Sequence, residues 1–191
     1  MFTDHLDGAT LTGARWLAAT ADPAAAERWL RERTGLLPVP IGERFDVLYL
    51  HEGWAAAVLE ILRVNGRAVG PVLRSVREQR MGVLVAPGSA EHWTLPNSAV
   101  SAKADTLTLA CPFPGTYDGT SGLLWSYLPE GSGDLTSTTD LIDALDAHFA
   151  ALPDGRRPEA SPAGAPVRSR LLTYSPPPIL PPCESGRDAP R

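Results

Sequence analysis

The stretch FDVLYLHEGWAAAVLEIL, residues 45–62, decides the fold class of this chain. Its first six residues are dense in the aromatic and branched side chains that favour a β-strand. After His51, Glu52 and Gly53, apolar residues recur from Trp54 at the i, i+4, i+5 and i+8 spacing of an amphipathic helix. A strand followed so closely by a helix is the start of a βα unit.

The flanking sequence predicts further short elements of both kinds. Asp22 and Pro23 are typical of a helix start, because an N-cap aspartate accepts an orphan N–H and proline has none to lose. The predicted helices cover residues 10–18, 23–33, 53–65 and from one of residues 136–139 to 152. The predicted strands cover 45–50, 71–76, 81–85, 105–111 and 122–128, with an extended segment at 36–40. This order predicts an α+β fold with a small mixed β-sheet and flanking helices.

The composition limits the possible partners and compartment. Hydrophobic residues make up 43% of the chain, which is enough to build a core. A formal net charge of -5 argues against a broad basic surface for nucleic acid, although a local basic groove stays possible. Cys111 and Cys183 form no disulfide framework and no Cys-x-x-Cys metal spacing. Residues 1–7 lack an apolar signal-peptide core and the apolar runs are short, so we expect a cytoplasmic protein with no membrane partner.

The last part of the chain has a different composition from the rest. Residues 153–191 hold more than half of the 19 prolines, together with glycine, serine and arginine. Such a segment cannot bury enough apolar surface to offset the entropy lost on ordering it. We therefore expect a folded domain over residues 1–152 and a disordered, proline-rich C-terminal tail over residues 153–191.

Three polar residues near the first strand are candidates for catalysis. His51 and Glu52 follow the strand, where ligands of α/β sheets bind, and these residue types bind metals or move protons. The structural alternative is a turn in which the acid caps the next helix. Asp46 lies inside the strand as a possible ligand or base; the alternative is a residue that faces solvent or an arginine on an edge strand.

A second candidate group is basic. Arg74, Arg77 and Arg80 lie on the predicted hairpin, where they are candidates for nucleic-acid binding through phosphates. The alternative is that they keep an edge strand soluble. The sequence contains no HExxH motif and no cysteine–histidine cluster, so it predicts no metal site.

Four segments, in this order, resemble a known family. They are GARWLA (13–18), PIGERFDVLYL (40–50), GPVLRSVREQRMGVLVAPGSAE (70–91) and DTLTLACPFPGTYDGTSGLLWSYLP (105–129). Together they resemble the bifunctional DNA primase/polymerase N-terminal (prim-pol) domain of the archaeo-eukaryotic primases. They look more closely like small actinobacterial proteins with a reduced version of it. The resemblance covers about residues 10–152 and implies a reduced primase core.

The resemblance also implies where functional residues should lie. In that family a strand ends in an Asp-x-Asp pair that binds a divalent metal, and a later strand carries a histidine that contacts nucleotide phosphate. A third acid precedes a strand that ends in an Ala-Pro-Pro-Ser-like turn, and a tryptophan lies in the next strand. Residues 110–114 and Trp125 match the last two features. The other positions are filled by Tyr49 and His51, by Met81, and by Ser101.

The departures from the family pattern set the functional expectation. A hard divalent cation needs oxygen ligands, usually carboxylates, and these positions offer none. We therefore expect a non-catalytic domain that binds a nucleotide, a nucleic acid or a protein partner without a cofactor. One alternative is an active Mg²⁺-dependent nucleotidyltransferase that uses His51, Glu52 and Asp46 as unorthodox ligands. Another is a protein interaction module that acts through the proline-rich tail.

The tryptophans predict the position of the core. Trp54 and Trp125 lie on apolar stripes of a helix and a strand, so both are expected to be largely buried. Trp93 lies in a polar loop and is expected to be exposed.

Limited proteolysis of the full chain tests the predicted boundary. Because residues 153–191 have almost no apolar periodicity, the protease should remove them and leave a stable core that ends near Leu152. Mass spectrometry of the fragments checks the boundary. Uniform resistance through residue 191 would contradict it.

Overall fold

The strand and helix predicted over residues 45–62 form β2 (Asp46–His51) and α3 (Glu52–Val64). The structure is a computed structural model that describes residues 8–93, 99–100 and 108–152. The predicted tail, residues 153–191, lies outside the described residues. The other elements are α1 (Gly8–Ala18), α2 (Pro23–Glu32), β1 (Leu36–Pro40), β3 (Val72–Ser75), β4 (Arg80–Val85), the short 3₁₀ helix η1 (Ser89–His92), β5 (Ala99–Val100), β6 (Thr108–Pro112), β7 (Tyr117–Asp118), β8 (Leu123–Tyr127) and α4 (Thr138–Ala150).

The α+β class is confirmed by two sheets. The central sheet has the strand order β5-β2-β4-β3-β8-β7, and β1 pairs with β6 in a separate two-stranded ribbon. Every pairing between these named strands is antiparallel. The sequence predicted a mixed sheet. Among the described residues, parallel pairing is limited to one isolated bridge, between Val85 and Thr136.

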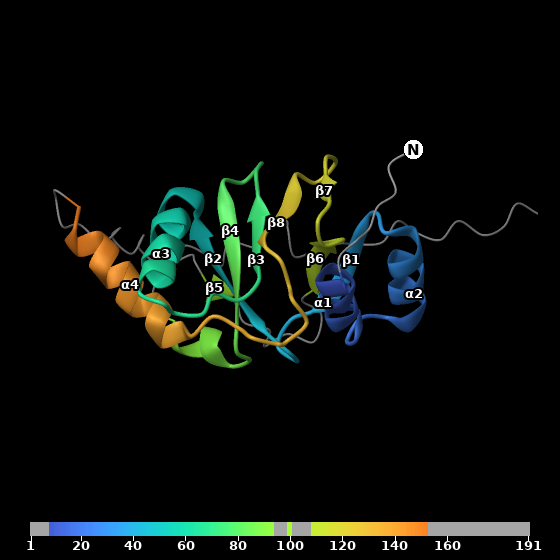
Figure 1. The fold of residues 1–191 in the computed structure, drawn as a ribbon, viewed down its shortest axis with the longest axis horizontal. Helices are drawn as coiled ribbons and strands as arrows, with labels where there is room; N and C mark the ends of the chain where they lie inside the picture. The colour runs from blue at the N-terminus through green and yellow to red at the C-terminus, as the bar shows by residue number, and fades with distance from the viewer. Residues whose placement is uncertain (1–7, 94–98, 101–107, 153–191) are drawn as a thin grey trace, which may run out of the picture.

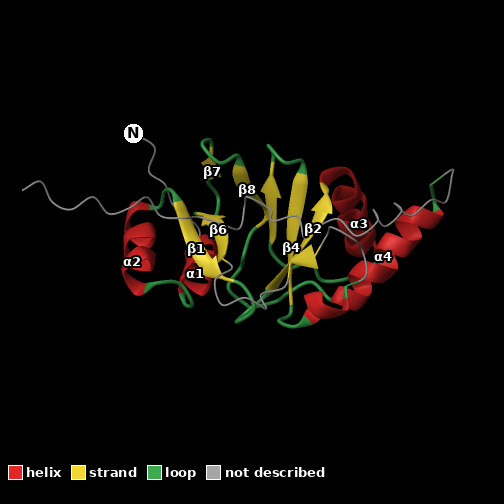
Figure 2. Ribbon diagram, turned by 180° about the vertical axis from the view of Figure 1, so that it is seen from behind, coloured by secondary structure: helices red, strands yellow, loops and turns green. Residues whose placement is uncertain are grey.

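The elements form layers on both faces of the central sheet. Figures 1 and 2 show α3 and α4 on one side of the sheet, and α1, α2 and the β1–β6 ribbon on the other. Each side has its own apolar cluster. The helix-side core includes Leu48, Leu50 and Leu62, and the ribbon-side core includes Val47 and Leu84. Because β2 contributes to both clusters, its apolar run is nearly continuous rather than alternating.

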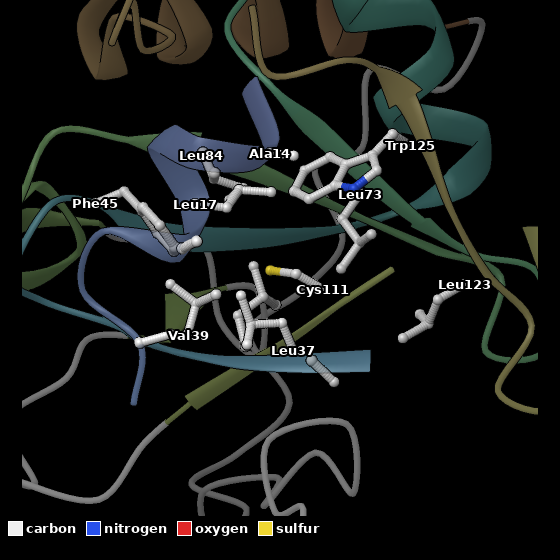
Figure 3. Close-up of a cluster of buried hydrophobic side chains, with 14 of the residues drawn as sticks. Ala14, Leu17, Leu37, Val39, Phe45, Leu73, Leu84, Cys111, Leu123 and Trp125 are labelled. Carbon is white, nitrogen blue, oxygen red and sulfur yellow. The ribbon is translucent and has the colours of Figure 1, made fainter. Parts of the chain in front are cut away.

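Figure 3 shows the ribbon-side core from inside. The sulfur of Cys111 lies among apolar side chains, including Leu37 and Leu73. Burial raises the pKa of this thiol far above its usual range, so the thiol stays protonated and unreactive.

The helix starts follow the predicted capping chemistry. The Asp22 carboxylate accepts a hydrogen bond from the Ala25 N–H at 2.8 Å, and Pro23 follows it. The cap predicted within residues 136–139 is Ser137, whose Oγ accepts from the Asp140 N–H at 3.3 Å. Across the described ranges, no helix has the length and apolar character needed to cross a membrane.

The tryptophan predictions are confirmed only in part. Trp125 is 7% exposed, and its Nε1–H donates to the Pro112 carbonyl at 2.9 Å. Trp54 is only half-buried, with its ring 5.6 Å from that of Phe149 in an edge arrangement. The prediction for Trp93 is wrong, because this residue packs partly buried against the helix-side core. The sequence pattern missed this because the polar neighbours of Trp93 say nothing about the distant core that it contacts.

The substitution Trp125→Ala tests the position of the ribbon-side core. It removes a buried ring and leaves the Pro112 carbonyl without its donor, so we expect a loss of about 3–5 kcal/mol in the free energy of unfolding. Urea denaturation checks this value. The control Tyr117→Ala removes an exposed aromatic ring and should cost less than about 1 kcal/mol. Equal costs for the two variants would show that the core is misplaced.

Candidate functional site

Polar side chains from three neighbouring strands meet where β2 ends. Antiparallel register pairs Ser75 of β3 with Arg80 of β4, and pairs Arg80 with His51 of β2. Two residues further into the sheet, on the same face, Tyr49 pairs with Gly82. Directly paired residues point to the same side of a sheet. This row therefore lies on the ribbon side of the sheet, the side that holds Tyr49.

His51 is exposed and begins helix α3. Its Nδ1 accepts a hydrogen bond from the Gly53 N–H at 3.3 Å, and its ring lies 5.8 Å from the Trp54 ring. The sequence suggested Glu52 as the residue that caps this helix. In the structure, the His51 imidazole makes the cap. His51 has a structural role in the protein as it stands, while its exposed ring stays accessible to a ligand.

Glu52 lies in the first turn of α3 and forms an ion pair with Arg74 of β3. Both side chains are partly exposed, so the pair is screened by solvent and contributes modestly to stability. The pair ties the start of the helix to the neighbouring strand. It also leaves the Glu52 carboxylate with a fixed counter-charge.

The three predicted arginines do not form one patch. Arg74 reaches Glu52 on the helix side of the sheet, whereas Arg80 belongs to the row on the ribbon side. Arg77 lies in the turn between β3 and β4 and donates to the Gly119 carbonyl at 3.3 Å. Strand alternation separates residues whose sequence spacing suggested a single basic group.

Asp46 lies at the opposite end of β2 from His51. The five residue steps between their positions span roughly 17 Å at ~3.3 Å per residue. Asp46 is 1% exposed, and its Oδ2 accepts from the Ala90 N–H at 3.1 Å, at the start of η1. The expectation that it faces solvent on an edge strand is wrong, because β5 and β4 flank β2 and the carboxylate has a buried backbone donor. Its role is to hold the loop after β4.

Tyr49 is the residue at the site that sequence reasoning undervalued. It is 4% exposed, and its hydroxyl has no hydrogen-bond partner among the described residues. Its ring lies over Gly82, where an added Cβ would come within 3.0 Å of Tyr49 Cε1. Burial raises the pKa of the phenol far above its usual range, so the group is a neutral donor. The glycine opposite it was the one available signal in the sequence.

Arg80 lies two residues from Gly82 along β4, on the same face of the sheet as Tyr49. It is half-buried, and within the described part of the chain its guanidinium has no ion pair or hydrogen bond. It acts electrostatically on Tyr49, lowering the pKa of the phenol against the larger effect of burial. The end of the sheet therefore combines an uncompensated positive charge with a buried neutral donor.

The positions that the family resemblance assigns to metal and phosphate ligands do not form a carboxylate site. Tyr49 and His51 share a face, but Met81 is buried in the helix-side core and points the other way. Ser101 lies outside the described residues. No three histidine, cysteine, aspartate or glutamate side chains gather as a metal site within residues 8–93, 99–100 and 108–152. The residues present at the end of β2 do not fit Mg²⁺.

A separate cavity of about 550 Å³ lies between α2 and β1. Trp29, Leu36 and Pro38 contribute apolar lining, and Arg28 and Glu32 contribute charge. No residue of the sheet-end site lines it, so the two features are independent.

The substitution His51→Asp tests the capping role of this residue. Aspartate is a strong N-cap and places a negative charge at the positive end of the helix dipole. We expect the free energy of unfolding to rise by about 0.5–1 kcal/mol, as measured by urea denaturation. His51→Ala is the matched control and should lower it by a similar amount. A loss of stability in the aspartate variant would contradict the capping role.

Three comparisons with known proteins were negative. A scan against models of protein families finds no match. Searches of the curated proteins and of the solved structures find no significant match either.

Proposed function

We propose that this chain is a non-catalytic, prim-pol-like domain that binds phosphate groups of a nucleotide or nucleic acid at the end of β2. One observation carries the proposal. Where the resembled family has its metal-binding acids, this chain has a neutral buried phenol and a cap histidine beside an arginine without a counter-charge. A cationic site of this kind attracts phosphate, whereas a metal site requires carboxylates.

The acids near the site support binding without catalysis. Two-metal phosphoryl transfer needs carboxylates close enough to share the ions. Asp46 is engaged with the Ala90 N–H at the far end of the strand, and Glu52 is engaged with Arg74. Neither carboxylate is placed to share an ion with His51.

The alternative function, binding of a protein partner, would use a different part of the chain. It rests on the proline-rich tail, residues 153–191, which lies outside the described residues. The sheet-end arginines favour phosphate instead, because Arg77 and Arg80 bring positive charge to one end of a chain whose net charge is -5. Binding should therefore depend on these residues and not on the tail.

Binding and polymerisation assays on the full chain test this function together. We expect the protein to bind a nucleoside triphosphate or a short single-stranded oligonucleotide, with affinity that falls as salt rises. We expect no product in primer-extension or primer-synthesis assays with Mg²⁺ or Mn²⁺. Removal of residues 153–191 should leave the affinity unchanged.

Two outcomes would overturn the proposal. The first is metal-dependent product that disappears in His51→Ala or Glu52→Ala but persists in the control Glu60→Ala, whose carboxylate lies on the exposed face of α3. This would establish an active nucleotidyltransferase. The second is binding of neither ligand, which would favour the tail as the functional segment.

A further inference from the structure

We propose that the cavity between α2 and β1 is a binding site for a free amino acid with a large apolar side chain. The ligand carboxylate binds the Arg28 guanidinium, and the ligand ammonium binds the Glu32 carboxylate. The ligand side chain packs against Leu36 and Pro38 of β1. This site goes beyond the proposed function, because none of its residues belongs to the sheet end where we propose that phosphate binds.

The contacts of Trp29 fix the two walls of this cavity. Figures 1 and 2 show α2 beside β1, at the end of the molecule away from α3 and α4. Trp29 Nε1–H of α2 donates to the carbonyl of Gly35, just before β1, at 3.3 Å, and the Trp29 ring lies 5.0 Å from that of Phe113. The cavity of about 550 Å³ is within the range of roughly 300–1,000 Å³ that is usual for small-molecule sites. It is therefore large enough for an amino acid with a bulky side chain.

The β1 wall of the cavity is apolar. Leu36 and Pro38 are half-buried and share one face of the strand, whereas Leu37 between them is buried in the ribbon-side core. Among the described strands, β1 pairs only with β6, so its other edge has no partner strand. Pro38 and Pro40 have no N–H with which an added strand could pair. The wall therefore favours a compact apolar group over an extended peptide.

The α2 wall of the cavity supplies the charges. Arg28 and Glu32 both line the cavity, and residues four apart on a helix have their Cβ atoms about 5–6 Å from each other. Neither side chain has an ion pair or a hydrogen bond in the part of the chain that the structure describes. The neighbouring pair, Glu27 and Arg31, has the more favourable order of acid before base and forms an ion pair at 3.0 Å outside the cavity. The reverse order at positions 28 and 32 leaves two opposite charges available to a ligand.

These charges favour a zwitterion over an anion. A free amino acid carries its ammonium and its carboxylate on one carbon, so side chains whose Cβ atoms are about 5–6 Å apart can reach both groups. The third charged residue of the lining is Asp22, whose carboxylate accepts from the Ala25 N–H at 2.8 Å. The lining thus has two acids and one base, which disfavours a phosphate or another purely anionic ligand. An amine without a carboxylate would leave Arg28 without a counter-charge.

The probe for this site is L-phenylalanine, titrated into the full chain by isothermal calorimetry. We expect saturable binding of one molecule per chain. N-acetyl-L-phenylalanine lacks the ammonium and L-phenylalaninamide lacks the carboxylate, so each should bind about ten-fold more weakly or worse. L-Serine keeps both charges but lacks the apolar side chain, so it should give no measurable binding.

Matched substitutions on α2 test the two charged contacts. Arg28→Gln and Glu32→Gln should each weaken phenylalanine binding by about ten-fold or more, because each removes a charge-assisted hydrogen bond. Arg31→Gln and Glu27→Gln are the controls, since they remove the same charges from the same helix outside the cavity and should leave the affinity unchanged. All four side chains are exposed, so the variants should fold as the wild type does.

Two further measurements test the position of the site. Ala25 is half-buried and lines the cavity, so the larger side chain of Ala25→Leu should occupy the ligand's space and abolish binding. Leucine is a strong helix former, so circular dichroism should show the helix content of the wild type. In NMR spectra of the isotope-labelled wild-type chain, phenylalanine should shift the amide signals of Gly35 and Leu36 more than that of Gly82 in the central sheet.

The outcomes separate this inference from the proposed function. Absence of saturable binding by the wild type overturns the site, as does binding that survives both Arg28→Gln and Glu32→Gln. The largest amide shifts lying outside α2 and β1 also overturn it. Equal affinity for N-acetyl-L-phenylalanine overturns the ammonium contact. Because the two sites are independent, Arg80→Gln should leave phenylalanine binding unchanged, and Arg28→Gln should leave nucleotide binding unchanged.

Discussion

The burial of β2 on both faces is the constraint on which the rest of the structure depends. Val47 packs into the ribbon-side core and Leu48 into the helix-side core, and both are fully buried. A strand in this position requires a layer on each side, which α3 and α4 supply on one and α1 with the β1–β6 ribbon on the other (Figure 1). Polar chemistry on β2 is thereby restricted to its two ends, where Asp46 and His51 lie.

The two ends of β2 have opposite electrostatic characters. At the first end, the Asp46 carboxylate accepts a hydrogen bond from a backbone N–H in the segment after β4, so this acid has a structural role. At the second end, Glu52 is neutralised by Arg74, and Arg80 stays uncompensated among the described residues. A positive charge therefore remains at the end of β2 that opens toward solvent. This asymmetry, rather than the net charge of the chain, decides what kind of ligand the sheet end attracts.

The sequence could predict local structure but not the contacts that cross the chain. The strand and helix of residues 45–62 and the caps at Asp22 and Ser137 follow from patterns within a few residues. The Asp46 contact with Ala90 joins positions 44 residues apart, and no local pattern marks it. The division of Arg74 and Arg80 between two faces depends on which strands flank β3 and β4. That order is set by packing of the whole sheet and not by spacing along the hairpin.

Gly82 connects the register of the sheet to the chemistry of its end. Any larger residue at this position would place a Cβ within 3.0 Å of Tyr49 Cε1 and Val47 Cγ1, in a core where neither side chain has room to move. The absence of that side chain leaves room for the Tyr49 ring over β4. A carboxylate pair at positions 49 and 51 would need no such space, since aspartates are short. The glycine is therefore an accommodation to the tyrosine, and the two residues together place a neutral, buried phenol near the end of β2.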